Sequence, residues 1–366
     1  MLAVTYNKRA MGNVKREDRA RRPTVRDVAA KAGVSHQTVS RVINGHNYVN
    51  SATRERVTAA IEALDYVPNA VARSLSSDRT HTVGVVTNDI SDHFFAQFVA
   101  GAEAEARRRG LYLLIGSVED AVPNDEEAYL RLMLQRRLEG LIIARPVLAP
   151  ASQHRLRAVA RRMPLVLVAS QPEPPVLASV DVDNKAGGRD ATAYLLQLGH
   201  RRIATITGPL EWVSARLRLE GYRDALMASA AGVDGALVER CEDWGLEAGA
   251  AAMVRLLDLG KPFTAVFAHS DLLALGAITI LRERGLEVPT DVSVVGYDDI
   301  PVARFVNPAL TTMRQPMREV GRAALTMLLD DLDVTAKRPR QVLLKAELIM
   351  RDSAAPIGAF ASPAEG

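Results

Sequence analysis

Residues 24–44, TVRDVAAKAGVSHQTVSRVIN, predict two short helices joined by a tight turn. Thr24 can cap the first helix, and Asp27 three residues later completes a capping box. Gly33 ends that helix, because the left-handed backbone of a helix end costs glycine least. Ser35 is a natural N-cap for the second helix. Small residues beside the turn let the two helices cross closely, as a helix-turn-helix requires.

The two helices have an apolar side and a polar side. Apolar residues at helical spacing predict the inner side: Val28, Ala29, Ala32, Val39, Val42 and Ile43. The outer face of the second helix carries His36, Gln37, Thr38, Ser40 and Arg41. Helix-turn-helix proteins place a polar helix start of this kind in the major groove of DNA. The alternative is a small helical hairpin with a solvated polar face.

Composition limits the class of protein. The 366 residues are 48% hydrophobic, which is enough for a large core in two or three domains. The single cysteine, Cys241, excludes a disulfide framework and a cysteine-rich zinc site. No apolar run approaches the roughly 20 residues that span a bilayer, and the N-terminus lacks the apolar centre of a signal peptide. We therefore expect a cytoplasmic protein that needs no metal and no cofactor.

Positive charge is concentrated near the N-terminus. Residues 1–80 contain 14 Lys or Arg and 7 Asp or Glu, whereas the remainder contains 32 and 36. Neutralising DNA phosphates requires such a basic surface. Part of the surplus lies in residues 1–22, which we expect to form a disordered basic tail, so the asymmetry is only supporting evidence.

Two further segments precede the main body of the chain. Residues 51–69 predict a third helix, capped by Ser51, whose apolar side closes a three-helix core. The stretch from Ala70 to Leu75 can form a helix of about six residues ahead of a serine-rich linker. A helix so short is marginal in isolation and can therefore act as a switch.

From about residue 81, apolar runs alternate with segments of helical periodicity. The runs are 81–89, 111–118, 140–146, 164–170, 202–208, 265–270 and 293–299. This alternation predicts parallel sheets covered by helices. The strands fall into two sets, separated near residues 183–200, which predicts two lobes.

Several independent motifs follow one another along the chain. They are AGVSxxTVSRVIN (32–44), YVPN (66–69), NDISDHFF (88–95), DNKAGG (183–188), LGHRRIA (198–204), GPLEWVSARLRLEGY (208–222), SDLLALGA (270–277), DVSVVGYDDI (291–300), PALTTMRQP (308–316) and LIMRDS (348–353). With these motifs, about residues 23–353 resemble the lactose/galactose repressor (LacI/GalR) family. The resemblance implies an α/β protein with a three-helix headpiece, a hinge helix and a two-lobed core like that of periplasmic binding proteins. Its ligand would lie at the carboxyl ends of the strands.

The resemblance also implies domain boundaries. The expected parts are a basic tail (1–22), a DNA-binding headpiece (23–69), a hinge helix and linker (70–80), an effector-binding and dimerisation core (81–353) and a disordered tail (354–366). Within the core, the N-lobe is expected at about 81–198 and 315–340. The C-lobe is expected at about 199–313 and 341–353.

The resemblance assigns DNA contacts to the headpiece and hinge. His36 and Gln37 would read base edges in the major groove, and Arg41 a base or a phosphate. The residues that would position the headpiece on the DNA backbone, with a purely structural role as the alternative, are Thr24, Ser35, Thr38, Ser40, Asn44 and Tyr66. Leu75 matches a hinge leucine that wedges a minor-groove step, with Ala72 packing against its two-fold mate. The alternative for Leu75 is an anchor to the core.

An effector site between the lobes is implied as well. Arg218 matches a ligand-clamping arginine, and Asp183 and Asp298 match carboxylates that accept hydrogen bonds from the ligand. Trp244 matches an aromatic residue that stacks on a sugar ring. Asp298 could instead cap a turn.

Other candidates for this site are less specific. Phe94 and Phe95 would close the cleft from the opposite lobe, with an ordinary core position as the alternative. The weaker candidates are Asp89, Arg145, Trp212, Ser214 and Ser270. Ser270 stands where sugar-binding relatives often carry asparagine, so the ligand cannot be inferred from a relative. Asp271 is expected to cap the helix that follows it.

The resemblance implies a ligand-controlled transcriptional regulator, with repression favoured, that binds a near-palindromic operator as a homodimer. A sugar-like molecule in the cleft would change DNA affinity through the hinge helices. The C-terminus lacks leucine heptads, which favours a dimer over a tetramer. No nucleotide-binding, serine-hydrolase or zinc-protease motif is present, so we expect no enzyme. The alternatives are a small-solute receptor and a repressor controlled by a protein co-regulator.

Overall fold

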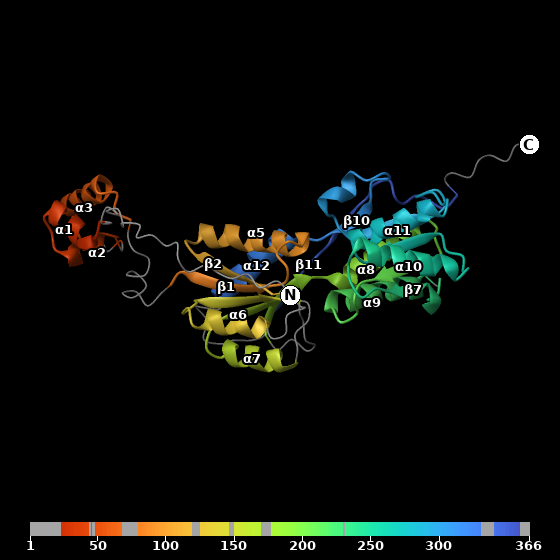
Figure 1. The fold of residues 1–366 in the computed structure, drawn as a ribbon, viewed down its shortest axis with the longest axis horizontal. Coiled ribbons are helices and arrows are strands. Elements are labelled where there is room, and N and C mark those ends of the chain that lie inside the picture. The colour runs from red at the N-terminus through yellow and green to blue at the C-terminus, as the bar shows by residue number, and fades with distance from the viewer. Residues whose placement is uncertain are drawn as a thin grey trace, which may run out of the picture. The chain divides into compact units, whose positions relative to one another are not determined.

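The computed structural model describes residues 23–43, 45, 48–67, 80–118, 125–145, 150–169, 177–229, 231–330 and 340–358. The chain divides into two compact units at Thr80 and His81 (Figure 1). Asn44, Ala72 and Leu75 lie outside the described residues, and so do the expected hinge helix and residues 1–22. Within the described ranges, no helix is both long and apolar enough to cross a membrane.

The first unit contains three helices, α1 (Val25–Ala32), α2 (His36–Ile43) and α3 (Ser51–Ala63). The predicted capping box at Thr24 is confirmed, because its hydroxyl accepts the Asp27 N–H and its own N–H donates to the Asp27 carboxylate at 2.7 Å. Gly33 adopts a φ of +64° after α1. The Ser35 hydroxyl accepts the Thr38 N–H at 3.1 Å, which confirms the predicted cap of α2.

The core of this unit contains the residues of the first two helices that were predicted to face inward. Val28, Ala29, Ala32, Val39 and Val42 are buried and Ile43 is partly buried, and α3 adds the buried Val57 and Ala60. The predicted cap of α3 is wrong by one residue. The Asn50 side chain accepts the Thr53 N–H at 2.8 Å, and Ser51 is the first residue of the helix. Asparagine and serine cap equally well, so their order in the sequence does not decide between them.

The second unit contains two six-stranded sheets (Figure 1). The N-lobe sheet is parallel, in the order β11 (Gln341–Leu344), β5 (Ala178–Val182), β4 (Leu165–Val168), β3 (Gly140–Ala144), β1 (Thr82–Thr87), β2 (Tyr112–Ser117). The C-lobe sheet has the order β12 (Glu347–Ile349), β10 (Thr311–Arg314), β9 (Ser293–Asp298), β8 (Ala265–Ala268), β6 (Ile203–Thr207), β7 (Val238–Arg240). Only β12 is antiparallel to its neighbour. The predicted parallel sheets in two lobes are confirmed.

Helices cover both sheets, as buried parallel strands require. The N-lobe helices are α5 (His93–Arg108), α6 (Asp125–Leu134), α7 (Pro150–Ala160) and α12 (Met317–Asp330). The C-lobe helices are α8 (Asn184–Gln197), α9 (Val213–Ala228), α10 (Leu246–Asp258) and α11 (Asp271–Glu283), with the 3-10 turns η1 (Gly235–Leu237) and η2 (Pro301–Arg304). The residues of β3 and β4 are all buried.

The lobe boundaries differ from the expected ones in two places. The chain passes between the lobes after β5, between β10 and α12, and between β11 and β12. Helix α8 packs against α9 and the C-lobe sheet, so residues 184–197 belong to the C-lobe. Strand β11 pairs in parallel with β5 and belongs to the N-lobe. The short apolar run of this edge strand does not reveal which sheet it joins, because its pairing partner β5 lies far away in the sequence.

Residues 354–358, expected to belong to the C-terminal tail, are bonded to the C-lobe. The Ala355 N–H donates to the Ser293 hydroxyl at 3.1 Å, and the Ile357 N–H donates to the Leu198 carbonyl at 2.9 Å. These bonds fix a segment of small residues that has no periodic pattern. The expected boundary at residue 354 is therefore wrong.

Helices α8 and α9 approach each other closely at two glycines. A Cβ atom on Gly188 would lie 2.3 Å from the carbonyl oxygen of Arg218, and one on Gly221 would lie 2.1 Å from that of Lys185. Both obstructing atoms belong to the backbone, so only a shift of a whole helix could make room. The crossing thereby fixes the position of Arg218 on α9 relative to the start of α8.

Gly221→Ala is expected to lower the free energy of unfolding by about 1–3 kcal/mol, the usual effect of overpacking a tight contact. Urea denaturation followed by circular dichroism measures it. Gly235→Ala is the matched control, because its added Cβ would have no atom within 4 Å. Equal stability of the two variants would contradict the close crossing.

Candidate functional site

A cavity of about 430 Å³ opens between the two lobes of the second unit. It lies beyond the carboxyl ends of β4, β5 and β9, where parallel sheets generally bind ligands. Eight of the residues predicted for an effector line it: Phe94, Phe95, Trp212, Ser214, Arg218, Trp244, Ser270 and Asp298.

Three predicted residues do not line the cavity and instead bond to residues beside it. The Asp89 carboxylate accepts the N–H and the hydroxyl of Ser91 at 2.8 and 2.7 Å. Arg145 is buried and donates to the Asn88 side chain at 2.6 Å. Asp183 caps α8 by accepting the Ala186 N–H at 2.9 Å.

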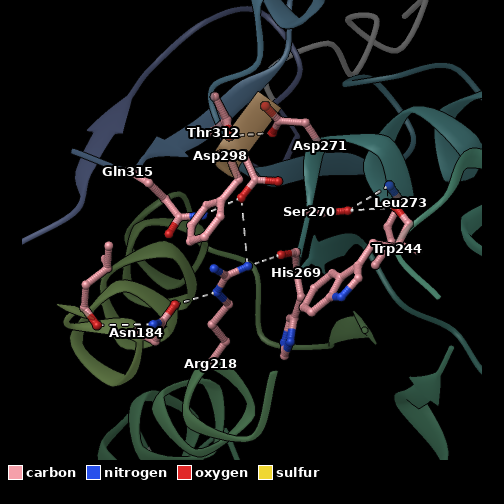
Figure 2. A network of polar contacts seen from close by, with 12 residues as sticks. Asn184, Arg218, Trp244, His269, Ser270, Asp271, Leu273, Asp298, Thr312 and Gln315 are labelled. Atoms are coloured by element: carbon pink, nitrogen blue, oxygen red, sulfur yellow. Dashed lines mark hydrogen bonds and ion pairs between the residues drawn. The ribbon is translucent and has the colours of Figure 1, made fainter. Parts of the chain in front are cut away.

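Arg218 is the buried cation at the centre of the site, with 3% of its surface exposed. Its Nε donates to the Asn184 side chain at 2.9 Å and its Nη1 to the His269 carbonyl at 2.5 Å. The guanidinium carbon lies 3.6 Å from the centroid of the Tyr297 ring. Figure 2 shows the hydrogen bonds from the guanidinium to Asn184 and His269. The side chain is thus held by groups from α8, β9 and the loop before α11.

Asp298, the last residue of β9, lies beside this guanidinium. Its Oδ1 is 3.9 Å from Arg218 Nη1 and accepts the Gln315 side-chain N–H at 2.5 Å (Figure 2). Burial raises the pKa of Asp298 to about 7, although the Arg218 charge and the Gln315 hydrogen bond act in the opposite direction. The backbone φ of Asp298 is +123°, which is rare for a residue with a side chain. The Asp298 carboxylate is thus held in a buried position, where its ionised form is disfavoured.

The expected role of Asp271 as a helix cap is wrong. Ser270 caps α11 by accepting the Leu273 N–H at 3.1 Å, and Asp271 is fully buried behind it. The Asp271 carboxylate accepts the Ile300 N–H at 2.8 Å and the Thr312 hydroxyl at 2.5 Å. Burial, followed by the neighbouring Asp298 charge, raises its pKa well above the ordinary value. Asp271 therefore stabilises the loop after β9 by accepting the Ile300 N–H.

Aromatic side chains form the walls of the cavity. The Trp212 and Trp244 rings meet edge to face with centroids 5.4 Å apart. Trp244 lies against Gly208, where an added Cβ would come within 2.4 Å of the indole. Phe95 is 2% exposed and belongs to the core, as its alternative interpretation holds, whereas Phe94 is only partly buried. Both phenylalanines nevertheless reach the cavity.

Six polar lining residues were missed by the sequence analysis: Ser91, Asp92, His93, Asp181, Asn184 and Gln315. Asp181 and Asn184 flank the carboxyl end of β5, and the strand-end rule could have found them. Asp92 caps α5 by accepting the Phe94 N–H at 2.7 Å. Gln315 lies between β10 and α12, where the chain passes from the C-lobe to the N-lobe.

In the first unit, the candidate DNA contacts fall into two groups. His36, Gln37 and Arg41 on α2 are exposed. Thr24, Ser35 and Thr38 take part in helix caps, and Tyr66 packs against the apolar core. Ser40 is half-buried. Thr24, Ser35, Thr38 and Tyr66 therefore have structural roles within the headpiece. Their expected contacts with the DNA backbone stay a prediction.

Known proteins share this organisation. Residues 24–69 match the family model for bacterial regulatory proteins of the lacI family, and residues 192–354 match that for a periplasmic binding protein-like domain. The HTH-type transcriptional repressor CytR of Escherichia coli (strain K12) is 36% identical over 334 residues, which cover 90% of this chain and 96% of that protein.

Solved structures agree with this match. The crystal structure of the lac repressor dimer bound to operator and the anti-inducer ONPF superposes with a TM-score of 0.83 and 34% identity, over 91% of this chain and 99% of that chain. The complex of the transcriptional regulator CelR with cellobiose gives a TM-score of 0.68 and 36% identity, over 91% and 100%. The chain therefore belongs to the lacI family of bacterial DNA-binding transcriptional regulators, which are not enzymes.

Proposed function

We propose that this protein is a repressor that binds a near-palindromic operator as a homodimer and responds to a sugar-like molecule in the interlobe cavity. One observation carries the proposal: the same chain presents an exposed polar helix start on α2 and a cavity with a buried arginine between aromatic walls. A repressor of this kind acts on DNA in the bacterial cytoplasm.

The DNA contacts follow from the exposed face of α2. His36 and Gln37, in its first turn, would meet base edges, and Gln37 can form a bidentate pair with adenine. Arg41 would reach a base or a phosphate. Two-fold symmetry of the dimer would place one α2 on each half-site.

The effector contacts follow from the cavity. The indole face of Trp244 suits the apolar face of a sugar ring. Asp298 can accept hydrogen bonds from ring hydroxyls, and Arg218 holds Asp298 in place. Because both lobes line the cavity, a ligand can bind one arrangement of the lobes more tightly than another, which is the requirement for control at a distance. Among related proteins, the lac repressor structure contains the anti-inducer ONPF and the CelR structure contains cellobiose, a sugar.

Operator affinity is expected to fall steeply with salt, because bound phosphates release counterions. An operator selected from random DNA serves as the probe in fluorescence anisotropy.

Gln37→Ala should lose about 1–3 kcal/mol of discrimination at one base pair of each half-site. Glu62→Ala, an exposed change on α3, is the control. A flat plot of log K against log salt would refute the expected contacts with DNA phosphates.

Tryptophan fluorescence should report ligand binding, because both tryptophans of the chain line the cavity. Titration with a panel of sugars, sugar phosphates and nucleobases is expected to give a saturable change for one class. Trp244→Phe should raise the dissociation constant for that ligand at least about tenfold, which corresponds to a loss of roughly 1.4 kcal/mol of binding free energy. No response to the whole panel from the folded wild type would favour a protein co-regulator instead.

Asp298→Asn tests whether this carboxylate serves the ligand or the fold. The raised pKa of about 7 means that the folded protein loses stability as pH rises from about 4 to about 7, while the unfolded chain ionises normally. The variant cannot ionise, so its free energy of unfolding should gain about 1–3 kcal/mol on the wild type between about pH 4 and about pH 8. Thermal denaturation at both pH values measures the gain. A variant less stable at every pH would identify Asp298 as a structural cap.

A further inference from the structure

We infer that the mouth of the interlobe cavity is an apolar subsite built by the C-lobe, so that the effector is a sugar joined to an apolar group, a glycoside with an apolar aglycone. The inference deepens the proposed function and rests on it. It follows from the exposed apolar side chains that line the cavity, from the contacts that fix them and from their separation from the polar groups.

Four apolar residues of the C-lobe line the cavity and form what we call the apolar rim: Leu272, Ile300, Pro301 and Val302. Leu272 lies in the first turn of α11, and the other three follow β9 and lead into η2. Leu272 is 37% exposed and Val302 is 44% exposed, although both side chains are apolar. A group of exposed apolar side chains indicates a binding surface, whereas one such residue alone does not.

Hydrogen bonds hold the two segments of the apolar rim together. The Ile300 N–H donates to the Asp271 carboxylate at 2.8 Å, which joins the loop after β9 to the residue before Leu272. The Leu310 N–H donates to the Ala303 carbonyl at 2.7 Å, and Ala303 is fully buried. The rim is therefore formed before a ligand binds, and a ligand loses little affinity in ordering it.

The polar groups of the cavity lie deeper than the apolar rim. Arg218 is 3% exposed and Asn184 is 2% exposed, and their side chains are joined by a hydrogen bond of 2.9 Å (Figure 2). Asp298 lies beside Arg218 and can bond to a sugar hydroxyl in either protonation state. A ligand that reaches from these groups to the rim therefore needs a polar end and an apolar end.

A second sugar ring suits the apolar rim poorly. Its hydroxyl groups would lose water beside four side chains that contain no polar atom, and a buried hydroxyl without a partner is unfavourable. An aromatic group loses nothing of this kind and gains from burial. About 55 Å² of additional apolar contact corresponds to about tenfold in affinity.

The alternative occupant of the apolar rim is a second copy of this chain. The rim, however, shares one cavity of about 430 Å³ with the buried Arg218, and this volume lies in the range of small-molecule sites. One small molecule can contact both the rim and the polar groups. We therefore assign the rim to the effector.

Phenyl and methyl glycosides of the same sugar test the inference on the full-length protein, because the two members of a pair differ only in the aglycone. Pairs made from both anomers of glucose, galactose and xylose are titrated by isothermal titration calorimetry. In the pair that binds most tightly, the phenyl glycoside is expected to bind at least about tenfold more tightly than the methyl glycoside. Cellobiose, with a second sugar in place of the phenyl group, is expected to bind more weakly than phenyl β-D-glucoside.

Val302→Thr tests whether the rim recognises the aglycone. The change keeps the branching of the side chain and replaces one methyl group with a hydroxyl. It should reduce the ratio of phenyl to methyl glycoside affinity at least about threefold. Leu272→Ala, which shortens the other strongly exposed side chain, should reduce the same ratio.

Val233→Thr is the matched control, since Val233 is 38% exposed and lies between α9 and η1, outside the interlobe cavity. It should leave the ratio unchanged. Circular dichroism checks that all three variants fold, and analytical ultracentrifugation measures their molar mass.

Several results would overturn the inference. They are a methyl glycoside or cellobiose that binds as tightly as the phenyl glycoside, a ratio unchanged in both rim variants, or no binding of any glycoside. A lower molar mass of Val302→Thr with an unchanged ratio would assign the rim to an interface between copies and overturn it as well.

The proposed function fails separately from this inference. Glycosides that bind without a preference for phenyl, yet change operator affinity, would refute the apolar subsite alone. A phenyl glycoside that binds with the expected preference, yet leaves operator affinity unchanged, would refute the regulatory role alone.

Discussion

The placement of one buried guanidinium, that of Arg218, is the constraint on which the interlobe cavity depends. A charge removed from water must be compensated by nearby polar groups, or the fold is destabilised by several kcal/mol. Here Asn184, the His269 carbonyl and Asp298 provide compensation, and the Tyr297 ring covers one face. Gly188 and Gly221 make this possible, since they let α8 and α9 approach closely enough for Asn184 to reach the arginine. The close packing of α8 against α9 is thus also what allows the charge of Arg218 to be compensated.

From Arg218 a chain of polar contacts leads to a segment that connects the lobes. Asp298 joins the arginine to Gln315, which lies just after β10, and Asp271 joins the loop at Ile300 to Thr312 on β10 itself. A ligand that changes the charge state or the partners of Asp298 therefore acts directly on the connection between β10 and α12.

The sequence was a good guide wherever a local chemical rule applied. The capping box at Thr24, the left-handed Gly33 and the cap at Ser35 follow from the preferences of single turns, and the structure contains all three. Arg218, Trp244 and Asp298 were identified by resemblance, and the structure brings them to one cavity.

The sequence was a poor guide wherever the outcome depended on distant parts of the chain. Asp181 and Asp183 are similar in type and spacing, yet β5 ends at Val182, so only Asp181 reaches the cavity while Asp183 turns away to cap α8. The cap of α11 comes from Ser270 and not from Asp271 for the same kind of reason, because the Asp271 carboxylate bonds to Ile300 and Thr312, which lie far along the chain. The lobe assignments of α8 and β11 depend on pairing and packing partners that no periodic pattern reveals.

The repeated passage of the chain between the lobes has a consequence for how the protein is made. The N-lobe sheet lacks one edge strand until β11 has been synthesised. The C-lobe sheet lacks one edge strand until β12 follows a few residues later. Neither lobe can therefore be completed before most of the other lobe has been synthesised. In many other chains, by contrast, domains fold one after another during synthesis. The cavity that both lobes share can form only when translation is nearly finished. Until then the nascent headpiece, which needs only its own residues for its core, can already be folded while the part that would regulate it is not.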